Sequence, residues 1–144
     1  MDNTMALLLS DTYKQCHDRM YPKGLTKLVS YWVPRKSMLE NQNEMVFFGL
    51  QAFIKEYLMG YFQKNFFDLS EDEMLTLYTD SMDVQIGRDN YDLDKIVELH
   101  RLGYLPLEIR ALPEGTLVPM GVPCIEITNT DDKFAWLVQW IECI

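Results

Sequence analysis

Cysteine is scarce in this sequence, and its pattern excludes two classes of protein. Cys16, Cys124 and Cys143 are odd in number and share no CxxC spacing. Neither a disulfide scaffold nor a zinc knuckle is therefore indicated. A reducing compartment, the cytoplasm, fits this cysteine usage best.

Positive charge is also in short supply. The chain has 13 Lys and Arg residues against 22 Asp and Glu residues, which gives a net charge of −9 at pH 7. Such a field repels the phosphates of nucleic acids and anionic lipid surfaces, so we expect no nucleic-acid partner. An anionic substrate would need a local group of basic residues, and the sequence offers a sparse one at Lys23, Lys27, Arg35 and Lys36.

Long apolar runs and autonomous catalytic motifs are missing as well. No stretch approaches the ~20 apolar residues of a membrane span, and the N-terminus lacks the basic start of a signal peptide, so we expect no membrane association. GxGxxG, GxxxxGK[ST], HExxH and GxSxG do not occur. Of the two histidines, His100 on a helix face is expected to be structural, whereas His17 could line a site.

What is present is the composition of an ordinary folded protein. Apolar residues make up 48% of the chain and charged residues 24%, as in typical globular domains. A chain of 144 residues can bury one sizeable core. We therefore expect residues 1–144 to form a single domain.

The spacing of apolar residues predicts three helices in the middle of the chain. One broad apolar face runs from about Phe47 to Gln63. Ser70 and Glu73 have the spacing of a capping box ahead of a second helix, and a third helix begins near Asp92. An additional short helical segment is predicted near the N-terminus.

That N-terminal segment and the predicted strands complete the fold. A helix cap at Ser10-Asp11 opens a turn that Pro22 stops. Strands are predicted at 28–33, 106–112, 116–118 and 124–128, with type I turns at 112–115 and 118–121. The sequence therefore predicts an α+β fold, with a small, largely antiparallel sheet packed against helices.

The last segment is apolar on nearly every side. Thr130 or Asp131 can cap a helix that runs from Phe134 to Ile144. Such a helix should be buried all round, yet the sequence stops at Ile144 without a helix-ending residue. We expect either that the polypeptide continues or that a partner covers this helix; the alternative is a terminal helix docked on its own sheet.

Four stretches of the sequence resemble the nicotinamide phosphoribosyltransferase family. The stretches, in order, are Leu-Leu-Leu-Ser-Asp-Thr-Tyr-Lys at 7–14, Val-Phe-Phe-Gly-Leu-Gln at 46–51, Leu-Pro-Leu-Glu-Ile-Arg-Ala-Leu-Pro-Glu-Gly at 105–115, and Asn-Thr-Asp at 129–131 followed by Trp-Leu-Val-Gln-Trp-Ile-Glu at 136–142. The resemblance covers nearly the whole chain. Nicotinate-specific relatives share the Pro-Glu-Gly turn, so the acceptor base stays open.

The resemblance implies that this chain is the first part of an α/β sandwich domain of a type II phosphoribosyltransferase. The family's catalytic barrel, which follows in sequence, is absent here, and we expect this chain alone to be inactive. The implied parent reaction transfers phosphoribosyl from phosphoribosyl pyrophosphate to nicotinamide, giving nicotinamide mononucleotide and pyrophosphate in NAD salvage. It implies Mg²⁺ for the complete enzyme but no cofactor bound by this chain alone, and a homo-oligomer, a homodimer in the family.

Three residues of this sequence match positions that bind substrate in the family. Tyr13 resembles the tyrosine that stacks on the pyridine ring across the dimer interface, and Asp11 resembles an aspartate that orders the same pocket. Arg35 resembles a basic residue that approaches the phosphates of phosphoribosyl pyrophosphate. The alternatives are a tyrosine that covers the first helix, an ordinary helix cap and a solvated arginine at a strand end.

Two other functions remain open at this point. The chain could be a stand-alone, non-catalytic interaction module that binds a partner through the helix Phe134 to Ile144. It could also be a small independent enzyme, but no nucleophile, base and phosphate loop can be assembled from these residues.

Overall fold

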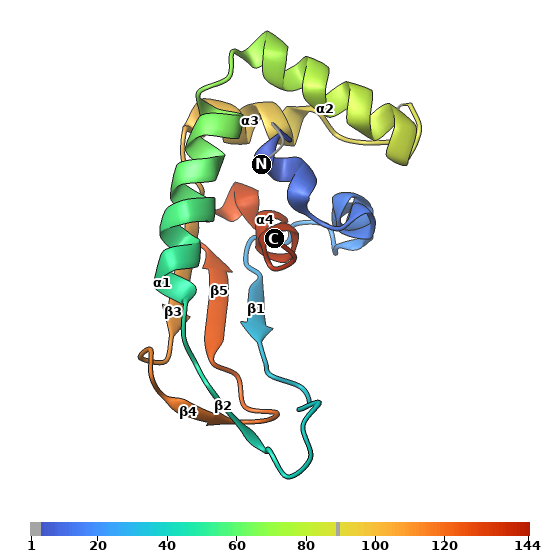
Figure 1. The fold of residues 1–144 in the computed structure, drawn as a ribbon. Coiled ribbons are helices and arrows are strands. Elements are labelled where there is room, and N and C mark those ends of the chain that lie inside the picture. The colour runs from blue at the N-terminus through green and yellow to red at the C-terminus, as the bar shows by residue number, and fades with distance from the viewer. Residues whose placement is uncertain (1–3, 89) are drawn as a thin grey trace.

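A computed structural model describes residues 4–88 and 90–144 and confirms the predicted α+β class. Within these residues the strands form two antiparallel sheets (Figure 1). In the three-stranded sheet the central strand β5 (Ile125–Asn129) lies between β1 (Val29–Trp32) and β3 (Leu107–Ala111). In the two-stranded sheet β2 (Glu44–Val46) pairs with β4 (Leu117–Pro119).

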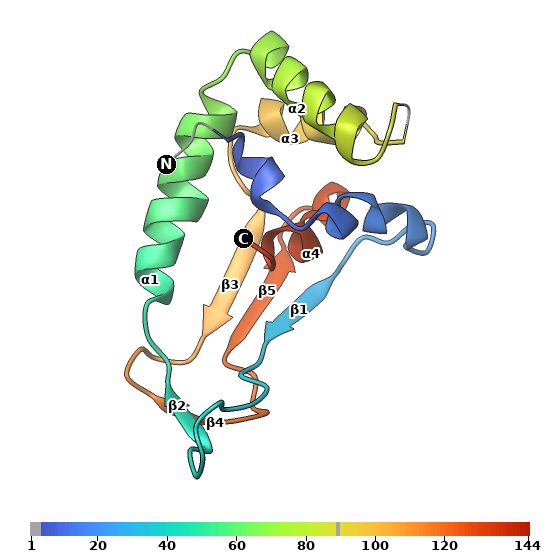
Figure 2. The ribbon, with the colours of Figure 1, turned by 45° about the vertical axis from the view of Figure 1, so that its right-hand side comes forward.

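The helices occupy the positions that the apolar spacing predicted. The 3-10 helices are η1 (Ala6–Leu9), η2 (Thr12–Met20) and η5 (Asp132–Phe134), and the α-helices α2 (Glu71–Gln85), α3 (Asp94–Leu102) and α4 (Leu137–Ile141). The helix α1 (Leu50–Phe53) continues as the π-helical stretches η3 (Ile54–Tyr61) and η4 (Gln63–Phe67). The α2 and α3 helices lie at one end of the molecule and the β2–β4 ribbon at the other (Figure 2).

The predicted start of the α1 helix is three residues too early. Phe47 is extended instead, because its backbone N–H donates to Thr116 and its carbonyl accepts from the N–H of Gly115. Gly49 then takes a positive φ of 99°, a conformation that glycine adopts without strain, and the helix follows it. The apolar ring of Phe47 belongs to a small second core with Val118 and Cys124 rather than to a helix face.

The capping box ahead of α2 is confirmed. Ser70 Oγ accepts a hydrogen bond from the backbone N–H of Glu73 at 3.3 Å, and the Glu73 carboxylate accepts from the N–H of Ser70 at 3.0 Å. At α3 the N-cap residue is Leu93, whose side chain makes no capping hydrogen bond, although the carboxylate of Asp92 one residue earlier accepts from the N–H of Asp94 at 3.0 Å. A local residue pattern therefore determines where α2 begins.

Replacing Ser70 with alanine is expected to lower the free energy of unfolding by about 1 kcal/mol, the usual cost of removing an N-cap hydroxyl. Urea denaturation followed by circular dichroism measures this change. Ser70→Asp, which preserves a capping acceptor, should retain most of the stability. Equal losses in both variants would contradict a capping role for this hydroxyl.

The two predicted turns lie one residue further along the chain. Hydrogen bonds from Thr116 N–H to the carbonyl of Pro113 and from Val122 N–H to that of Pro119, each 3.2 Å, define turns at 113–116 and 119–122. Gly115 and Gly121 stand at the third positions with φ of 91° and 86°. A positive φ at that position is what type II turns require, so the type I prediction was wrong.

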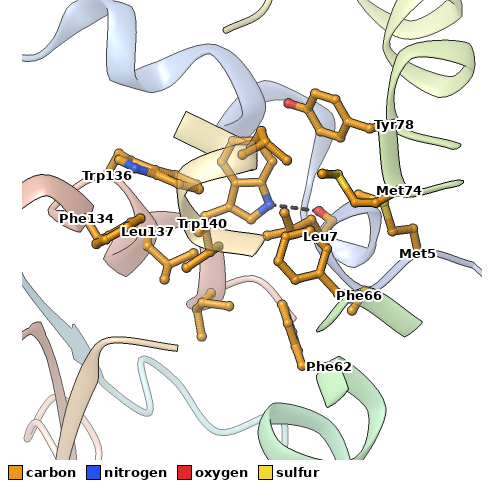
Figure 3. Close-up of a cluster of buried hydrophobic side chains, with 14 of the residues drawn as sticks. Met5, Leu7, Phe62, Phe66, Met74, Tyr78, Phe134, Trp136, Leu137 and Trp140 are labelled. Carbon is orange, nitrogen blue, oxygen red and sulfur yellow. Dashed lines mark hydrogen bonds between the residues drawn. The ribbon is translucent and has the colours of Figure 1, made fainter. Parts of the chain in front are cut away.

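The short C-terminal helix lies at the centre of the main core (Figure 3). Its Trp140 is 1% exposed, its indole N–H donates to the carbonyl of Leu7 at 2.8 Å, and its own carbonyl accepts from Ser10 Oγ at 2.8 Å. Around it pack side chains of η1, the long helix, α2 and α3, among them Leu7, Phe62, Phe66, Met74, Tyr78, Ile96 and Leu99.

This packing corrects the expectation that a partner must cover the segment from Phe134 to Ile144. The chain itself buries Phe134, Ala135, Trp136, Leu137, Val138, Trp140 and Ile141, each at 8% exposure or less. Only Gln139 and the last three residues are half-buried. The alternative, a terminal helix docked on its own sheet with both tryptophans half exposed, is right that the chain covers this helix itself but wrong about the exposure, because Trp136 and Trp140 are 8% and 1% exposed. In the part of the chain described here, no helix combines the length and apolar character needed to cross a membrane.

Candidate functional site

A groove of about 860 Å³ opens between the three-stranded sheet, the start of α1 and the C-terminal residues. Its floor is the sheet face that carries Trp32, Ile125 and Ile127. Residues 141–144 and Phe48 also line it. The lining is mainly apolar, with Arg35 and Glu142 as its charged members, which is the usual character of a ligand site.

Tyr13 lies beside this groove, next to the C-terminal residues that line it. Its hydroxyl lies 4.0 Å from the sulfur of Cys143, a groove residue, and its ring centroid lies 5.2 Å from that of His17. Contact with the Cys143 thiol raises the pKa of the Tyr13 phenol above its usual range. Tyr13 is 54% exposed, and its ring contacts only His17 and Lys14 of the same helix among the ring and cation–ring contacts of the described residues.

Asp11 reaches the same thiol. It occupies the N-cap position of η2, where its carbonyl accepts from the N–H of Lys14 at 2.9 Å, but its side chain makes no capping hydrogen bond. Burial raises the pKa of the Cys143 thiol, and a hydrogen bond with Asp11 raises it further. The structure thus brings Asp11 and Tyr13 together around Cys143.

Lys14 joins this corner of the groove to the sheet. Its ammonium forms an ion pair with Glu142, and the other oxygen of that carboxylate accepts a hydrogen bond from Ser30 Oγ. Burial lowers the pKa of Lys14, but the hydrogen bond and the charge of Glu142 outweigh burial and leave the pKa raised. Lys14 is therefore charged at neutral pH.

Arg35 lines the groove just beyond the end of β1. Its side chain is exposed, and among the described residues it makes no ion pair or side-chain hydrogen bond. The basic group predicted around it does not assemble, because Lys23 and Lys27 precede β1 and Lys27 donates to the carbonyl of Asn129 instead. Strand β1 lies between these lysines and Arg35 in the sequence, and an extended strand separates its two ends by about 3.3 Å per residue.

The two histidines have different surroundings. His100 hydrogen-bonds the carbonyl of Leu69 at 2.9 Å and meets the Phe66 ring edge to face, which confirms a structural role. His17 lies against Tyr13 and therefore borders the candidate site.

Among residues 4–88 and 90–144, no three His, Cys, Asp or Glu side chains lie close enough together to form a metal-ligand set.

Three residues at this corner escaped the sequence reasoning: Lys14, Glu142 and Cys143. Glu142 could have been noticed as the one charged residue in the apolar segment 134–144, because a charge in such a segment needs a partner. Lys14 directly follows Tyr13 in the chain. No local pattern connects Lys14 with Glu142, because the two are far apart in the sequence.

Comparison with known proteins identifies the family of this chain. Residues 5–109 match the family described as "Nicotinamide phosphoribosyltransferase, N-terminal domain". A nicotinamide phosphoribosyltransferase of Acinetobacter baylyi is 39% identical over 93% of this chain and 28% of its own length. One of Xanthomonas campestris pv. campestris is 31% identical over 96% of this chain and 27% of its own length. The chain thus spans little more than a quarter of the curated relatives it matches, and it belongs to the nicotinamide phosphoribosyltransferase family as an N-terminal portion.

Proposed function

We propose that this chain supplies one side of the substrate site of an enzyme that transfers phosphoribosyl from phosphoribosyl pyrophosphate to nicotinamide. The products are nicotinamide mononucleotide and pyrophosphate, as in pyridine nucleotide salvage. The family match and the exposed ring of Tyr13 beside the groove support this proposal most directly. The complete enzyme is further proposed to act in the cytoplasm as a homodimer, with this single domain completed by a catalytic barrel.

Each candidate residue has a chemical role in this proposal. The Tyr13 ring stacks on the flat, neutral pyridine ring, an interaction of about 0.5 to 1.5 kcal/mol beyond burial. Asp11 helps to hold the hydroxyl end of that tyrosine in place through Cys143. Arg35, which has no ionic partner among the described residues, offers a guanidinium fork to phosphate oxygens. The chain alone is expected to form no product.

A chimera tests the proposal. Residues 1–144 replace the corresponding segment of the Acinetobacter baylyi relative, and formation of nicotinamide mononucleotide is measured. The chimera should be active, and Tyr13→Ala should raise its KM for nicotinamide about 3- to 10-fold, as expected for a lost stacking partner. Tyr13→Phe, which keeps the ring, should stay within about twofold of the parent.

Tyr104 provides a matched control, because it is 55% exposed against 54% for Tyr13 and lies away from the groove. Tyr104→Ala should leave the KM unchanged. An unchanged KM in Tyr13→Ala would contradict the stacking role, and product formation by the 144-residue chain alone would contradict the view that it lacks the catalytic residues.

The alternative of a stand-alone interaction module loses its main support. That hypothesis depended on an uncovered apolar helix, and the chain itself covers residues Phe134 to Ile141 apart from the half-buried Gln139.

A further inference from the structure

The geometry of η2, which carries Tyr13, needs an explanation from outside the helix. It is a 3-10 helix of nine residues, whereas most 3-10 helices stop after three or four because their hydrogen bonds are poorly aligned. The Asp11 side chain does not cap it. Its backbone alone is therefore a weak support for a functional side chain.

Tyr13 makes only weak contacts of its own. Its hydroxyl meets Cys143 at 4.0 Å, the outer limit of a hydrogen bond to sulfur, and its ring meets His17 in a tilted arrangement. The Lys14 ammonium lies 5.5 Å from the centroid of the same ring. More than half of the side chain is exposed. These contacts cannot account for a single ring orientation, so the position of Tyr13 must come from the backbone on which it stands.

The next residue anchors that backbone. The Lys14 side chain is 9% exposed and ion-pairs with Glu142, whose side chain is 27% exposed. Glu142 is fixed in turn by the hydroxyl of Ser30 on β1. Helix η2, the end of α4 and strand β1 therefore meet at one carboxylate, and in Figure 2 the N-terminal segment runs beside α4 and β1.

We propose that Lys14 and Glu142 are positioning residues for Tyr13: their ion pair locks the first turn of η2 and so orients the Tyr13 ring beside the groove. This proposal depends on the proposed function, in which Tyr13 is the stacking face for nicotinamide. Neither Lys14 nor Glu142 needs to touch the substrate. Pairs that are this well buried lose stability sharply when one partner is removed, because the other charge stays buried and unpaired.

Fluorine NMR of the 144-residue chain tests the positioning directly. Tyrosines are replaced biosynthetically by 3-fluorotyrosine, and the Tyr13 signal is assigned by its loss in Tyr13→Phe. In Lys14→Met the Tyr13 signal should narrow and move to its position in the urea-unfolded chain. The signal of Tyr78, which is fully buried, should stay in place and report an intact core.

Two variants complete the test. Lys14→Arg restores the positive charge and should return the Tyr13 signal toward its original position. Lys133→Met makes the same change at the exposed pair of Lys133 and Glu98, with side chains 66% and 51% exposed, and should leave Tyr13 unaffected. An unmoved Tyr13 signal in Lys14→Met overturns the proposal. If Lys14→Met also shifts Tyr78, the milder Glu142→Gln decides in the same way.

Activity of the chimera separates this proposal from the function on which it depends. If both hold, Lys14→Met raises the KM for nicotinamide as Tyr13→Ala does, and Lys14→Arg restores it. A shifted Tyr13 signal together with an unchanged KM in Tyr13→Ala would support the positioning and refute the stacking role. A raised KM in Tyr13→Ala together with an unmoved Tyr13 signal in Lys14→Met would support the stacking role and refute the positioning role of Lys14.

Discussion

Replacing Trp140 with alanine is expected to unfold a large fraction of this chain. Truncating a buried tryptophan costs about 3 to 5 kcal/mol, because apolar contacts are lost and a cavity remains. The indole N–H of Trp140 also donates a hydrogen bond to the carbonyl of Leu7. Its ring packs edge to face against Trp136, with 5.2 Å between the ring centroids. A domain of this size is stable by only about 5 to 15 kcal/mol, so little of that stability would remain.

Urea denaturation followed by far-UV circular dichroism measures this loss. Trp32→Ala is the matched control, because Trp32 lies on β1 with 45% of its surface exposed, and exposed positions usually change stability by less than about 1 kcal/mol. The loss of stability in Trp140→Phe should lie between those of Trp140→Ala and Trp32→Ala. The phenylalanine refills much of the cavity but leaves the Leu7 carbonyl without the indole N–H. A Trp140→Ala variant as stable as Trp32→Ala would show that α4 is not the centre of the core.

The second large effect is expected at a part-buried ion pair near the C-terminal end of η2. Lys95 of α3 pairs with Asp18, with side chains 11% and 21% exposed. The same ammonium lies 5.0 Å and 5.3 Å from the ring centroids of Trp136 and Trp140. Asp18→Ala would leave this charge among aromatic rings without its carboxylate, at an expected cost of about 2 to 4 kcal/mol.

A double-mutant cycle measures the coupling in this pair. Lys95→Met removes the stranded charge while keeping a long apolar side chain over the tryptophan rings. In the Asp18→Ala background it should therefore recover most of the lost stability, with a coupling energy of about 1 to 3 kcal/mol. If the losses of stability in Asp18→Ala and Lys95→Met simply add in the double variant, the two side chains act independently. The exposed pair of Arg88 and Asp83 is the control, with Arg88 86% exposed and an expected coupling below about 1 kcal/mol.

The elements that the sequence predicted well are those set by nearby residues. The Ser70 capping box and the strand at 28–33 depend on patterns a few residues long, and both are present. The turns were misplaced by one residue, because a Pro and a Gly two positions apart fit more than one turn type until the φ of Gly115 and Gly121 is known.

Other features depend on partners that no local pattern reveals. Strand β5 pairs with both β1 and β3, and the register joins Val29 to Thr128 and Ser30 to Ile127. Burial of the C-terminal helix likewise comes from distant segments, so its apolar surface suggested an external partner that it does not need. Contacts of this kind are determined by the tertiary structure rather than by propensity.

The candidate site also contains both kinds of feature, those set by neighbours in the sequence and those set by tertiary contacts. Tyr13 and Asp11 are close in sequence, and the structure keeps them together around Cys143. Arg35 lies on the same groove, but β1 stands between it and the predicted basic residues Lys23 and Lys27, and the extended backbone of β1 separates its ends. Lys14 and Glu142 were missed because only the fold brings them together.

The order of the strands also determines when this site can form during synthesis. Tyr13 and β1 emerge early from the ribosome, but their partners β5 and α4 are made more than 90 residues later. At about 5 to 20 residues per second, the early segments wait at least several seconds without their partners. The corner around Cys143 is therefore among the last parts of this chain to assemble, and a chaperone that shields roughly its first 30 residues would act on this corner before β5 and α4 are made.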